Sequence, residues 1–448
     1  VPEAFESDAN MPQYKKDFYR FHSHLMEPWD GPASLCFTDG TTIGALLDRN
    51  GLRPSRYTLT KDGRVILSSE AGSLPVQPED VLKKGRLEPG KMFVVDLEAG
   101  RVIGDEELKQ SICMQQPYGA WLEASEVTLD DLPPADSKTS GKGQYEDRLH
   151  YHGYTKEELE RVLFPMFEDG KEAIGSMGAD NPLAALSEQP QHLSHYFRQK
   201  FAQVSNPPID SIRERSVMSL TSLLGRTRNV LDESAEHCRQ LRLDHPVLTN
   251  AEVEKIRHIQ LEGFRVHEIE CLFYVDNPET GLENAIKSIC KEADFAVKSG
   301  ANLLILSDRD ADAAKAAIPS LLAIGAVHHH LIERGVRSNV GLIVETGDAR
   351  STHHIASLIG YGANAVNPFM VYDILRHALR CGRLENSSEA GLEGYFRRVD
   401  NYRDAIGKGL LKILPKWGSR PSKVTRVRKS SSHSESLRRW WTRALPVH

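Results

Sequence analysis

The hydrophobic pattern of residues 281–368 is typical of a parallel α/β sheet. Three short apolar runs occur there, at residues 303–306, 340–344 and 363–366. Helix-length segments with apolar residues at helical spacing separate them, such as residues 283–298 and 319–334. Short buried runs with helix-length connections indicate parallel strands joined by crossover helices. A further apolar run at residues 272–275 is predicted to add a fourth strand ahead of these three.

Polar residues follow each of these apolar runs directly. They are Asp276 and Asn277, Ser307 and Asp308, Glu345 and Thr346, and Asn367. Ligand sites in parallel sheets collect at the carboxyl ends of the strands, so we expect these side chains to share one rim. Polar residues also end strands simply because chains turn in water. The pattern therefore indicates where a site would lie without indicating a reaction.

The stretch from Ser34 to Gly104 has the pattern of antiparallel hairpins. Its short runs of strand-forming residues are 35–37, 43–47, 56–59, 65–67, 92–95 and 102–103. Tight-turn dipeptides punctuate these runs at Asp39-Gly40, Asp62-Gly63 and Ala99-Gly100. Such dipeptides between short strands predict hairpins. A helix is predicted before them, at residues 14–26.

The middle of the chain changes from a polar segment to predicted helices. Residues 126–147 are polar, contain Pro133-Pro134 and have no periodicity, which predicts a linker or an ordered surface segment. A capping box is expected at residues 155–158, where Thr155 and Glu158 can satisfy each other's backbone N–H groups. Residues 181–196 and 212–224 are also predicted to be helical.

Composition is that of an ordinary globular protein with room for two or three domains. The 448 residues are 40% hydrophobic and 26% charged. No apolar stretch reaches the length of a membrane span, and the start at Val1 lacks a secretory pattern, so a cytoplasmic location is predicted. The six cysteines are scattered, which favours reduced thiols over disulfides or a zinc site.

Charge is distributed unevenly along the chain. The net charge is −6, yet the residues after Leu414 carry nine basic residues against the single acid Glu435. Trp417, Trp440 and Trp441 lie among these basic residues. Few apolar residues are present to form a core, so this tail is predicted to be disordered.

The usual motifs of catalysis and metal binding are missing from the sequence or incomplete. No Gly-rich phosphate loop follows a strand, and no H-E-x-x-H or G-x-S-x-G occurs. Asp308, Asp310 and Asp312 have the spacing of a calcium loop but lack its glycine and its distal Glu. The histidines at 328–330 fall within a predicted helix, which favours packing or a surface position over a metal site.

Several long motifs, in order from about residue 11 to residue 413, resemble the large subunit of glutamate synthase. They lie at residues 27–33, 47–54, 170–178, 201–210, 306–309, 319–323, 328–330 and 344–347. The resemblance implies a class II glutamine amidotransferase domain that hydrolyses glutamine. Ammonia would then pass through an internal tunnel, bounded partly by a central domain, to a barrel with FMN and an iron–sulfur cluster. There 2-oxoglutarate is aminated and reduced, which gives two glutamates per cycle.

The resemblance also implies a fold and domain boundaries. We expect an α+β first part with antiparallel β structure, a partial αββα N-terminal-nucleophile amidotransferase fold, followed by an α/β central domain with parallel strands and crossover helices. The expected segments are a partial amidotransferase domain at 1–125, a linker at 126–154, the central domain at 155–400, the start of a linker to an FMN domain at 401–413, and an unrelated basic tail at 414–448.

The resemblance predicts no catalytic, cofactor-binding or metal-binding residue in this chain. The family's nucleophile is a mature N-terminal Cys, whereas residue 1 here is Val, so the chain alone is expected to be inactive. FMN and the iron–sulfur cluster are expected only in the complete family member. The candidate site in this chain is instead a wall of the ammonia tunnel, formed by Ser205, Asn206, Pro207 and Pro208. Two adjacent prolines make a stiff turn, which fits either a passage wall or a structural corner.

Partners implied by the resemblance are the other parts of the large subunit and a reductant-supplying small subunit or ferredoxin. No membrane partner is expected, and nucleic acid is disfavoured because most of the chain is acidic. The alternatives are a non-catalytic interaction module whose basic tail binds nucleic acid, and a free-standing barrel enzyme that uses Asp308 and Glu345.

Overall fold

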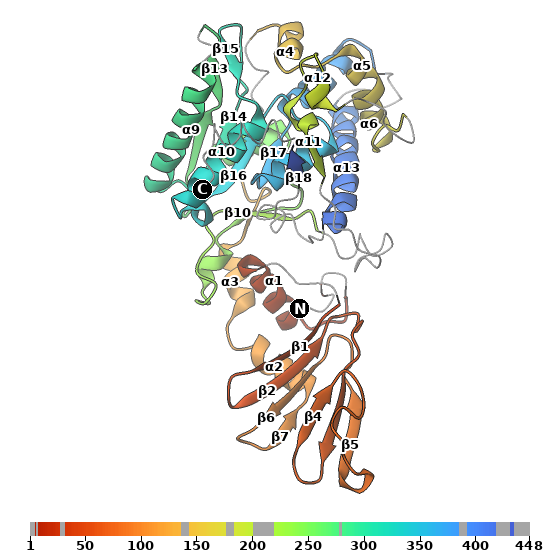
Figure 1. Cartoon of the computed structure of the whole chain (residues 1–448). Coiled ribbons are helices and arrows are strands. Elements are labelled where there is room, and N and C mark those ends of the chain that lie inside the picture. Colours follow the sequence, from red (N-terminus) through yellow and green to blue (C-terminus); the bar gives the residue numbers. More distant parts are fainter. Residues whose placement is uncertain are drawn as a thin grey trace. The chain divides into compact units, whose positions relative to one another are not determined.

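The computed structural model describes residues 5, 8–26, 32–135, 143–175, 183–199, 219–276, 280–384, 392–417 and 431–433 (Figure 1). The chain forms two compact units. Unit 1 comprises Val1–Ser125, Ser205–Arg213 and Glu233–Cys238, and unit 2 comprises Glu126–Val204, Glu214–Asp232 and Arg239–His448. Within the described residues, no helix is both long and apolar enough to cross a membrane.

Unit 1 contains two antiparallel sheets, as the hairpin pattern predicts. The first has the order β1-β2-β6-β7, formed by Ser34–Thr38, Thr42–Leu47, Met92–Asp96 and Arg101–Ile103. The second has the order β4-β3-β5, formed by Val65–Ser68, Arg56–Thr60 and Val81–Arg86. Tyr57 of β3 stacks on Phe93 of β6 with ring centroids 4.5 Å apart, beside the buried residues Ala45, Leu47 and Leu87. The two sheets therefore share one small apolar core.

Helices of unit 1 form a second, aromatic core. The helices that form this core are α1 (Gln13–Leu25), α3 (Tyr118–Ser125) and the short 3₁₀ helix η5 (Ala235–Cys238). Unit 1 also contains α2 (Asp105–Cys113) and the 3₁₀ helix η1 (Pro78–Asp80). Phe21 and Leu25 of α1 pack against Tyr118 and Leu122 of α3 and against Cys238 of η5. The helix predicted at residues 14–26 is thus confirmed, and its apolar face is buried within unit 1.

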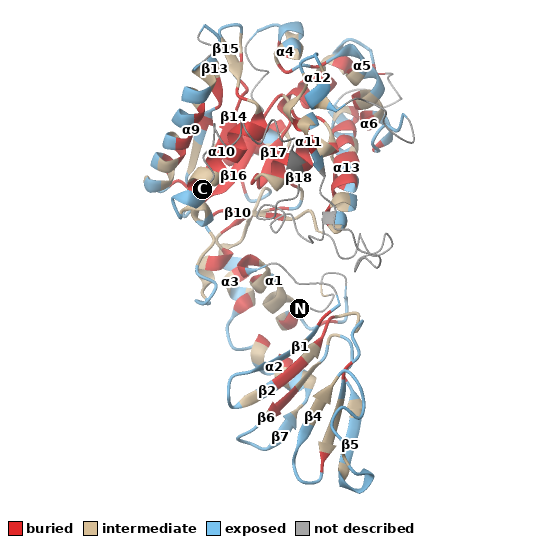
Figure 2. Ribbon diagram, in the orientation of Figure 1, coloured by how far each residue is buried: buried red, intermediate tan, exposed pale blue. Residues whose placement is uncertain are grey.

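Unit 2 is built on a parallel sheet with the order β12-β14-β16-β17. Its strands are Val266–Glu270, Leu303–Ser307, Gly341–Glu345 and Ala365–Asn367. The helices α9 (Gly281–Lys298), α10 (Ser320–Glu333) and α11 (Thr352–Gly360) connect successive strands. Three of the four predicted parallel strands, β14, β16 and β17, and the predicted crossover helices are confirmed. Figure 2 shows buried residues concentrated along β14, β16, β17 and α10.

The prediction for the fourth strand was wrong. Residues 272–274 form β13 (Leu272–Tyr274), which pairs antiparallel with β15 (Lys315–Ala317) outside the parallel sheet. The fourth parallel strand is β12, which has the sequence VHEIE. Only Ile269 of this edge strand is fully buried, so its polar positions conceal it from a search for apolar runs.

Several helices cover unit 2. Besides those named above they are α4 (Tyr145–Tyr151), α5 (Lys156–Glu158), a π-helical turn η2 (Leu159–Leu163), α6 (Phe164–Asp169), α8 (Asn250–Arg257), α12 (Phe369–Arg380) and α13 (Leu392–Trp417). Thr155 and Glu158 form the predicted capping box at the start of α5. Helix α13 runs without a break across residues 401–413, where the start of a linker was expected.

The two helices predicted between residues 181 and 224 are not formed in the described residues there. The described part of the first contains only the short 3₁₀ helices η3 (Ala184–Leu186) and η4 (Leu193–Tyr196). Pro190 lies between them, and a proline disrupts a continuous helix. The end of the second is a strand, β10 (Ser222–Leu224), which pairs with β11 (Leu241–Leu243). A short apolar run is compatible with a helix or a strand, and the sequence does not show which segment it pairs with.

The remaining short elements pair with distant segments. Strand β8 (Val127–Thr128) joins β11 in parallel, so part of the predicted linker is ordered in a sheet. Strand β9 (Phe197–Gln199) pairs with β18 (Ser431–His433), and η6 (Arg337–Asn339) precedes β16.

Candidate functional site

The carboxyl edge of the parallel sheet brings together most of the predicted rim. Ser307 and Glu345 are paired across β14 and β16, and Glu345 and Asn367 across β16 and β17. The backbone N–H of Asp308 donates to the Glu345 carbonyl over 3.1 Å, and that of Thr346 to the Asn367 carbonyl over 2.9 Å. All five residues are buried. The shared rim is therefore confirmed for these strands.

Asp276 does not join this rim. It follows β13, which lies outside the parallel sheet, and its side chain is exposed. Asn277 lies outside the described residues.

Glu345 lies at the centre of the rim and is fully buried. Arg309 contacts its Oε1 from Nε at 2.9 Å and from Nη2 at 2.8 Å. Arg257 Nη2 and Ser307 Oγ donate to its Oε2 over 2.7 and 2.6 Å. Burial alone would raise the pKa of Glu345, but the charges of Arg309 and Arg257 outweigh it and hold that pKa below its ordinary value. Glu345 is therefore an ionised carboxylate whose two oxygens are both occupied.

Both arginines are anchored by further contacts. Arg257 also pairs with Glu254 and, over 2.8 Å, with Glu268. The Arg309 guanidinium lies 4.4 Å from the centre of the Phe369 ring. A cation over an aromatic face is stabilised by the ring quadrupole. These contacts fix the two cations before any ligand binds.

A second carboxylate pair lies beside Glu345. Thr346 Oγ1 contacts both Asp308 and, over 3.0 Å, Asp348 Oδ1. Burial and the negative charge of Asp348 raise the pKa of Asp308 well above its ordinary value. Burial opposes ionisation of Asp348 too, but His192 and the hydrogen bonds from Ser320 lower its pKa. The surroundings thus shift the pKa values of the two carboxyl groups in opposite directions, up for Asp308 and down for Asp348.

A group of histidines begins beside Asp348. His192 Nε2 lies 3.7 Å from Asp348 Oδ2, and its ring stacks on His354 with centroids 4.2 Å apart. His353 Nε2 donates to the Ser194 carbonyl over 2.9 Å. Burial, and then the charge of His192, lower the pKa of His354 well below its ordinary value. This group joins η4 to α11.

Arg350 ties the rim to the start of α5. Its Nε and Nη2 donate to the two carboxylate oxygens of Glu158 over 3.0 and 3.1 Å, and its Nη1 donates to the His152 carbonyl over 3.1 Å. The His152 ring packs edge-on against Phe369, and a Cβ at Gly347 would lie only 2.5 Å from that ring. Glycine at 347 is therefore what allows His152 to approach. Burial lowers the pKa of His152 to about 4.

The chemistry available at the rim is limited. The carboxylate of Glu345 is saturated by cations, and the Ser307 hydroxyl is used as a donor to it. Arg309 Nη1 and His152 Nδ1 are buried and have no hydrogen-bond partner among the residues that the structure describes. Both side chains pack against Phe369. Among the described residues, no group of His, Cys, Asp or Glu side chains is arranged to hold a metal ion. The arrangement is that of an internally paired polar core.

The two sequence patterns weighed as metal sites have other contacts. Asp312 Oδ1 accepts from the backbone N–H groups of Ala314 and Lys315 over 2.8 and 2.9 Å, which forms a turn. His328 is buried, and its Nδ1 accepts from Arg337 Nε over 2.9 Å. The interpretation of His328 as a packing residue is confirmed.

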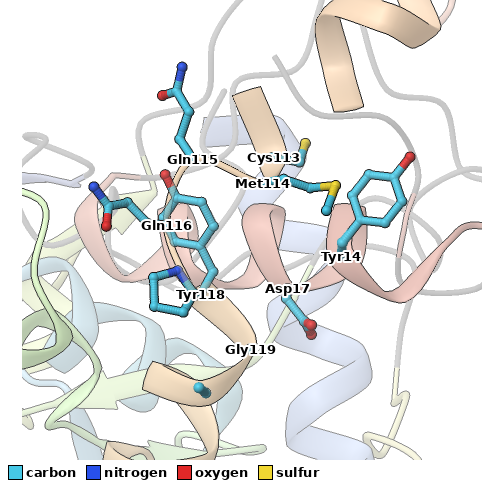
Figure 3. Close-up of a pocket in the computed structure, with 10 residues that line it drawn as sticks. Tyr14, Asp17, Cys113, Met114, Gln115, Gln116, Tyr118 and Gly119 are labelled. Atoms are coloured by element: carbon cyan, nitrogen blue, oxygen red, sulfur yellow. The ribbon is translucent and has the colours of Figure 1, made fainter. Parts of the chain in front are cut away.

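Unit 1 contains a cavity of about 440 Å³ that the sequence did not indicate. It is lined by residues of α1 and of the segment from the end of α2 into α3: Tyr14, Asp17, Cys113, Met114, Gln115, Gln116, Pro117, Tyr118, Gly119 and Ala120. The Tyr118 hydroxyl already donates to Glu233 over 2.9 Å. In Figure 3 the carboxylate of Asp17 and the amides of Gln115 and Gln116 point in different directions. These polar groups do not converge on one ligand position.

The structure describes the residues of the rim but not those of the predicted tunnel wall. Ser205, Asn206, Pro207 and Pro208 lie outside the described residues. At the rim, the sequence predicted neither Arg257 nor Asp348. Arg309 directly follows Asp308, so a search for charged residues beside strand ends would have found it. Arg257 lies 88 positions before Glu345, and no local pattern indicates that pair.

Two family models match the chain. The one described as glutamate synthase central domain matches residues 147–422, and the one described as class-II glutamine amidotransferases matches residues 1–121.

The glutamate synthases of Bacillus subtilis and Schizosaccharomyces pombe are similar to this chain and much longer. The NADPH glutamate synthase large chain of Bacillus subtilis is 43% identical over 421 residues, which are 93% of this chain and 27% of that protein. The NADH glutamate synthase of Schizosaccharomyces pombe is 40% identical over 439 residues, or 93% of this chain and 20% of that protein. A solved mandelate oxidase variant aligns with a TM-score of 0.27 at 18% identity, covering 41% of this chain and 46% of that one, which does not indicate a shared fold.

Proposed function

The chain belongs to the glutamate synthase family, and from this we propose that it acts as part of an enzyme that makes two L-glutamate from L-glutamine and 2-oxoglutarate with a reductant. The observation that carries the proposal is the central-domain match over residues 147–422, together with 43% identity to a glutamate synthase large chain over 93% of this chain. The chain spans about a quarter of that relative's length. The chemical steps of this reaction would be carried out with the other parts of such an enzyme.

The proposed contribution of unit 2 is a rigid scaffold. Support comes from the rim, where an α/β protein would normally bind a ligand. There Glu345 is saturated by Arg257, Arg309 and Ser307. A carboxylate held in this way stabilises an arrangement and is poorly placed to accept a substrate proton. For unit 1 we propose that its antiparallel sheets are part of an αββα amidotransferase fold.

FMN and an iron–sulfur cluster would be held elsewhere in the complete enzyme. An iron–sulfur cluster needs several cysteine thiolates at one place. The described cysteines are free and form no such group. At the sheet edge, the backbone N–H groups of Gly347 and Asp348 already donate to side chains of the rim, so they are not free to hold a phosphate. The residues described therefore do not fit either cofactor.

The proposed partners are the other parts of the large subunit and a source of reductant, either a small subunit or ferredoxin. Support comes from the similar proteins, which include NADPH-, NADH- and ferredoxin-dependent glutamate synthases.

We propose that Ser205, Asn206, Pro207 and Pro208 form part of the wall of an ammonia passage. The support is the resemblance of residues 201–210 to the family and the local chemistry. Two prolines fix the backbone, so a wall keeps its shape. The small polar groups of Ser205 and Asn206 can hydrogen-bond neutral ammonia without trapping it as an ion.

A chimaera tests the proposed function. In the Bacillus subtilis large chain, the matching segment is replaced by this chain, and glutamate formation is measured with glutamine and with ammonia as nitrogen source. We expect both activities to remain. A chimaera that folds and binds its flavin but makes no glutamate from either source would contradict the proposal.

The passage is tested in the same chimaera with Asn206→Leu, and Asn206→Ser serves as the small polar control. If Asn206 lines the passage, the Asn206→Leu variant should show lower glutamine-dependent synthesis, intact ammonia-dependent synthesis and an unchanged thermal midpoint. The Asn206→Ser variant should be near normal in all three measurements. Equal loss of both activities and of stability would identify a structural corner instead.

A further inference from the structure

Cys381 and His377 form an exposed thiol–imidazole pair at the end of α12, away from the rim. Cys381 Sγ lies 3.3 Å from His377 Nε2, within hydrogen-bond reach for sulfur. The residues are four positions apart, and the Cys381 backbone N–H donates to the His377 carbonyl over 2.9 Å. The helix itself therefore sets the distance between thiol and ring. Cys381 is exposed and His377 is half-buried.

A third side chain orients the imidazole. The Tyr145 ring of α4 stacks on His377 with ring centroids 3.6 Å apart and an interplanar angle of 8°. One helical turn away, Arg148 of α4 pairs with the buried Asp373 of α12 over 2.6 Å. This buried pair fixes α4 against α12, and so fixes Tyr145 against the ring. A nucleophile, a base within reach and a group that orients the base are the components of an activated thiol.

His377 lies in the last turn of α12, and Cys381 directly follows that helix. The thiolate is the nucleophilic form of a cysteine, so an activated thiol needs a base that can take its proton. His377 is the side chain in hydrogen-bond contact with the thiol, and it is therefore the necessary element of the pair.

We propose that Cys381 is a modification site that exchanges with low-molecular-weight disulfides, with His377 as its base. Cys381 Sγ attacks one sulfur of the disulfide R–S–S–R while His377 Nε2 takes the thiol proton. A Cys381–S–S–R bond forms, the R–S–S–R bond breaks, and the second sulfur leaves as a thiolate with the electron pair. The Cys381 sulfur is oxidised to the mixed disulfide and the leaving sulfur is reduced. The proton then passes from His377 to the released thiolate or to water.

The other cysteines provide controls within the same chain. Cys113, Cys238, Cys271 and Cys290 are buried, and burial raises the pKa of the Cys290 thiol to about 12. Cys36 on β1 is exposed like Cys381, but its thiol makes no hydrogen bond to any side chain in the described part of the chain. The comparison of Cys381 with Cys36 therefore separates activation by histidine from simple exposure.

The test measures disulfide exchange by the full chain. The probe is an aromatic disulfide whose released thiolate absorbs visible light, and mass spectrometry of digested samples assigns the modified residue. At pH 7 we expect Cys381 to react about tenfold faster than Cys36, because only Cys381 has a base in reach. The Cys381→Ser change should remove the fast phase, and Cys36→Ser should leave it.

Variants of the base and of its support complete the test. His377→Gln should slow Cys381 by about tenfold at pH 7 but not at pH 10, where ordinary thiols ionise without a base. Tyr145→Phe keeps the stacked ring and should keep the rate, whereas Tyr145→Ala should lower it. Unchanged thermal midpoints would confirm that the surface variants are folded. If Cys381 reacted no faster than Cys36, or equally fast with Gln at 377, the proposal would be overturned.

Discussion

The parallel sheet of unit 2 and the antiparallel sheets of unit 1 bury their residues differently. Every residue of β14 and β16 is buried, whereas β1 has no fully buried residue and β4 has none either. Large apolar side chains of unit 1, such as Phe37 and Ile43, remain nearly half exposed. Parallel sheets are covered on both faces, but antiparallel sheets often have one face in water. Unit 2 should therefore depend on its interior, and unit 1 on local turn geometry.

Polar groups sharpen this contrast. Unit 2 buries a charged network around Glu345, whereas the ion pairs of unit 1 include exposed ones such as Arg101–Glu107. A buried charge is costly unless it is paired, and removal of one partner leaves the other unpaired. An exposed pair is solvated in either case. The same kind of substitution should thus have very different consequences in the two units. Hydrogen exchange read by mass spectrometry can follow each unit separately.

The largest effect is expected for Glu345→Ala. It leaves Arg309 and Arg257 buried without their shared carboxylate, which should cost unit 2 about 3–5 kcal/mol of unfolding free energy. The matched control is Glu107→Ala in unit 1, which removes an exposed partner of Arg101 and should leave stability unchanged. Urea unfolding combined with hydrogen exchange measures both. Similar small effects in the two units would show that the buried network is not what holds unit 2.

A smaller effect is expected from apolar truncation. Ile343 of β16 is fully buried, so Ile343→Ala should destabilise unit 2 by about 3 kcal/mol through lost burial and a cavity. Ile43 of β2 is 47% exposed, so Ile43→Ala in unit 1 should cost well under about 1 kcal/mol. Unfolding midpoints with unchanged slopes would report these values. A large loss at Ile43 would mean that unit 1 also depends on a dense core.

Acid should reveal a cost of the buried polar interior. The pKa of His152 is about 4 in the folded chain, because of burial, against about 6.5 for an unfolded histidine. The unfolded state therefore takes up the proton first as the pH falls. The contribution of neutral His152 to the free energy of unfolding is intact above about pH 6.5 and is lost progressively as the pH falls to about 4. The loss amounts to about 2 kcal/mol at pH 5.

The variant His152→Gln measures this contribution. The loss of stability between pH 7.5 and pH 5 should shrink by about 2 kcal/mol relative to the unchanged chain, whatever the variant costs at pH 7.5. An identical pH dependence in both proteins would exclude His152 as a source of acid sensitivity.

The same contrast explains what the sequence could predict. Strand β14, with the sequence LLILS, is buried throughout and is therefore recognisable as an apolar run. Strand β5, with the sequence VLKKGR, lies at a sheet edge and has no fully buried residue, so its pairing with β3 is invisible in its composition. Residues at strand ends could be predicted because topology alone brings Ser307 and Glu345 together. Arg257 could not, because α8 meets β16 only through tertiary packing.

The smallest effect tests the turns of unit 1. Gly40 lies in the hairpin between β1 and β2 with φ +98°, and a Cβ added there would meet nothing within 4 Å. Gly104 also has open space for a Cβ, but its φ is −70°. The two sites therefore differ in backbone conformation rather than in room. Gly40→Ala should destabilise the β1–β2 hairpin by about 1 kcal/mol, because left-handed backbone strains an L-residue.

Gly104→Ala is the matched control and should be neutral or slightly stabilising, since alanine reduces the freedom of the unfolded chain. Exchange rates of the β1 and β2 amides measure the effect. Faster exchange only for Gly40→Ala would show that turn geometry limits the stability of this hairpin. If both variants exchanged alike, the stability of the β1–β2 hairpin would have to come from the contacts of Ala45 and Leu47 with the second sheet, and the two units would differ less than their burial indicates.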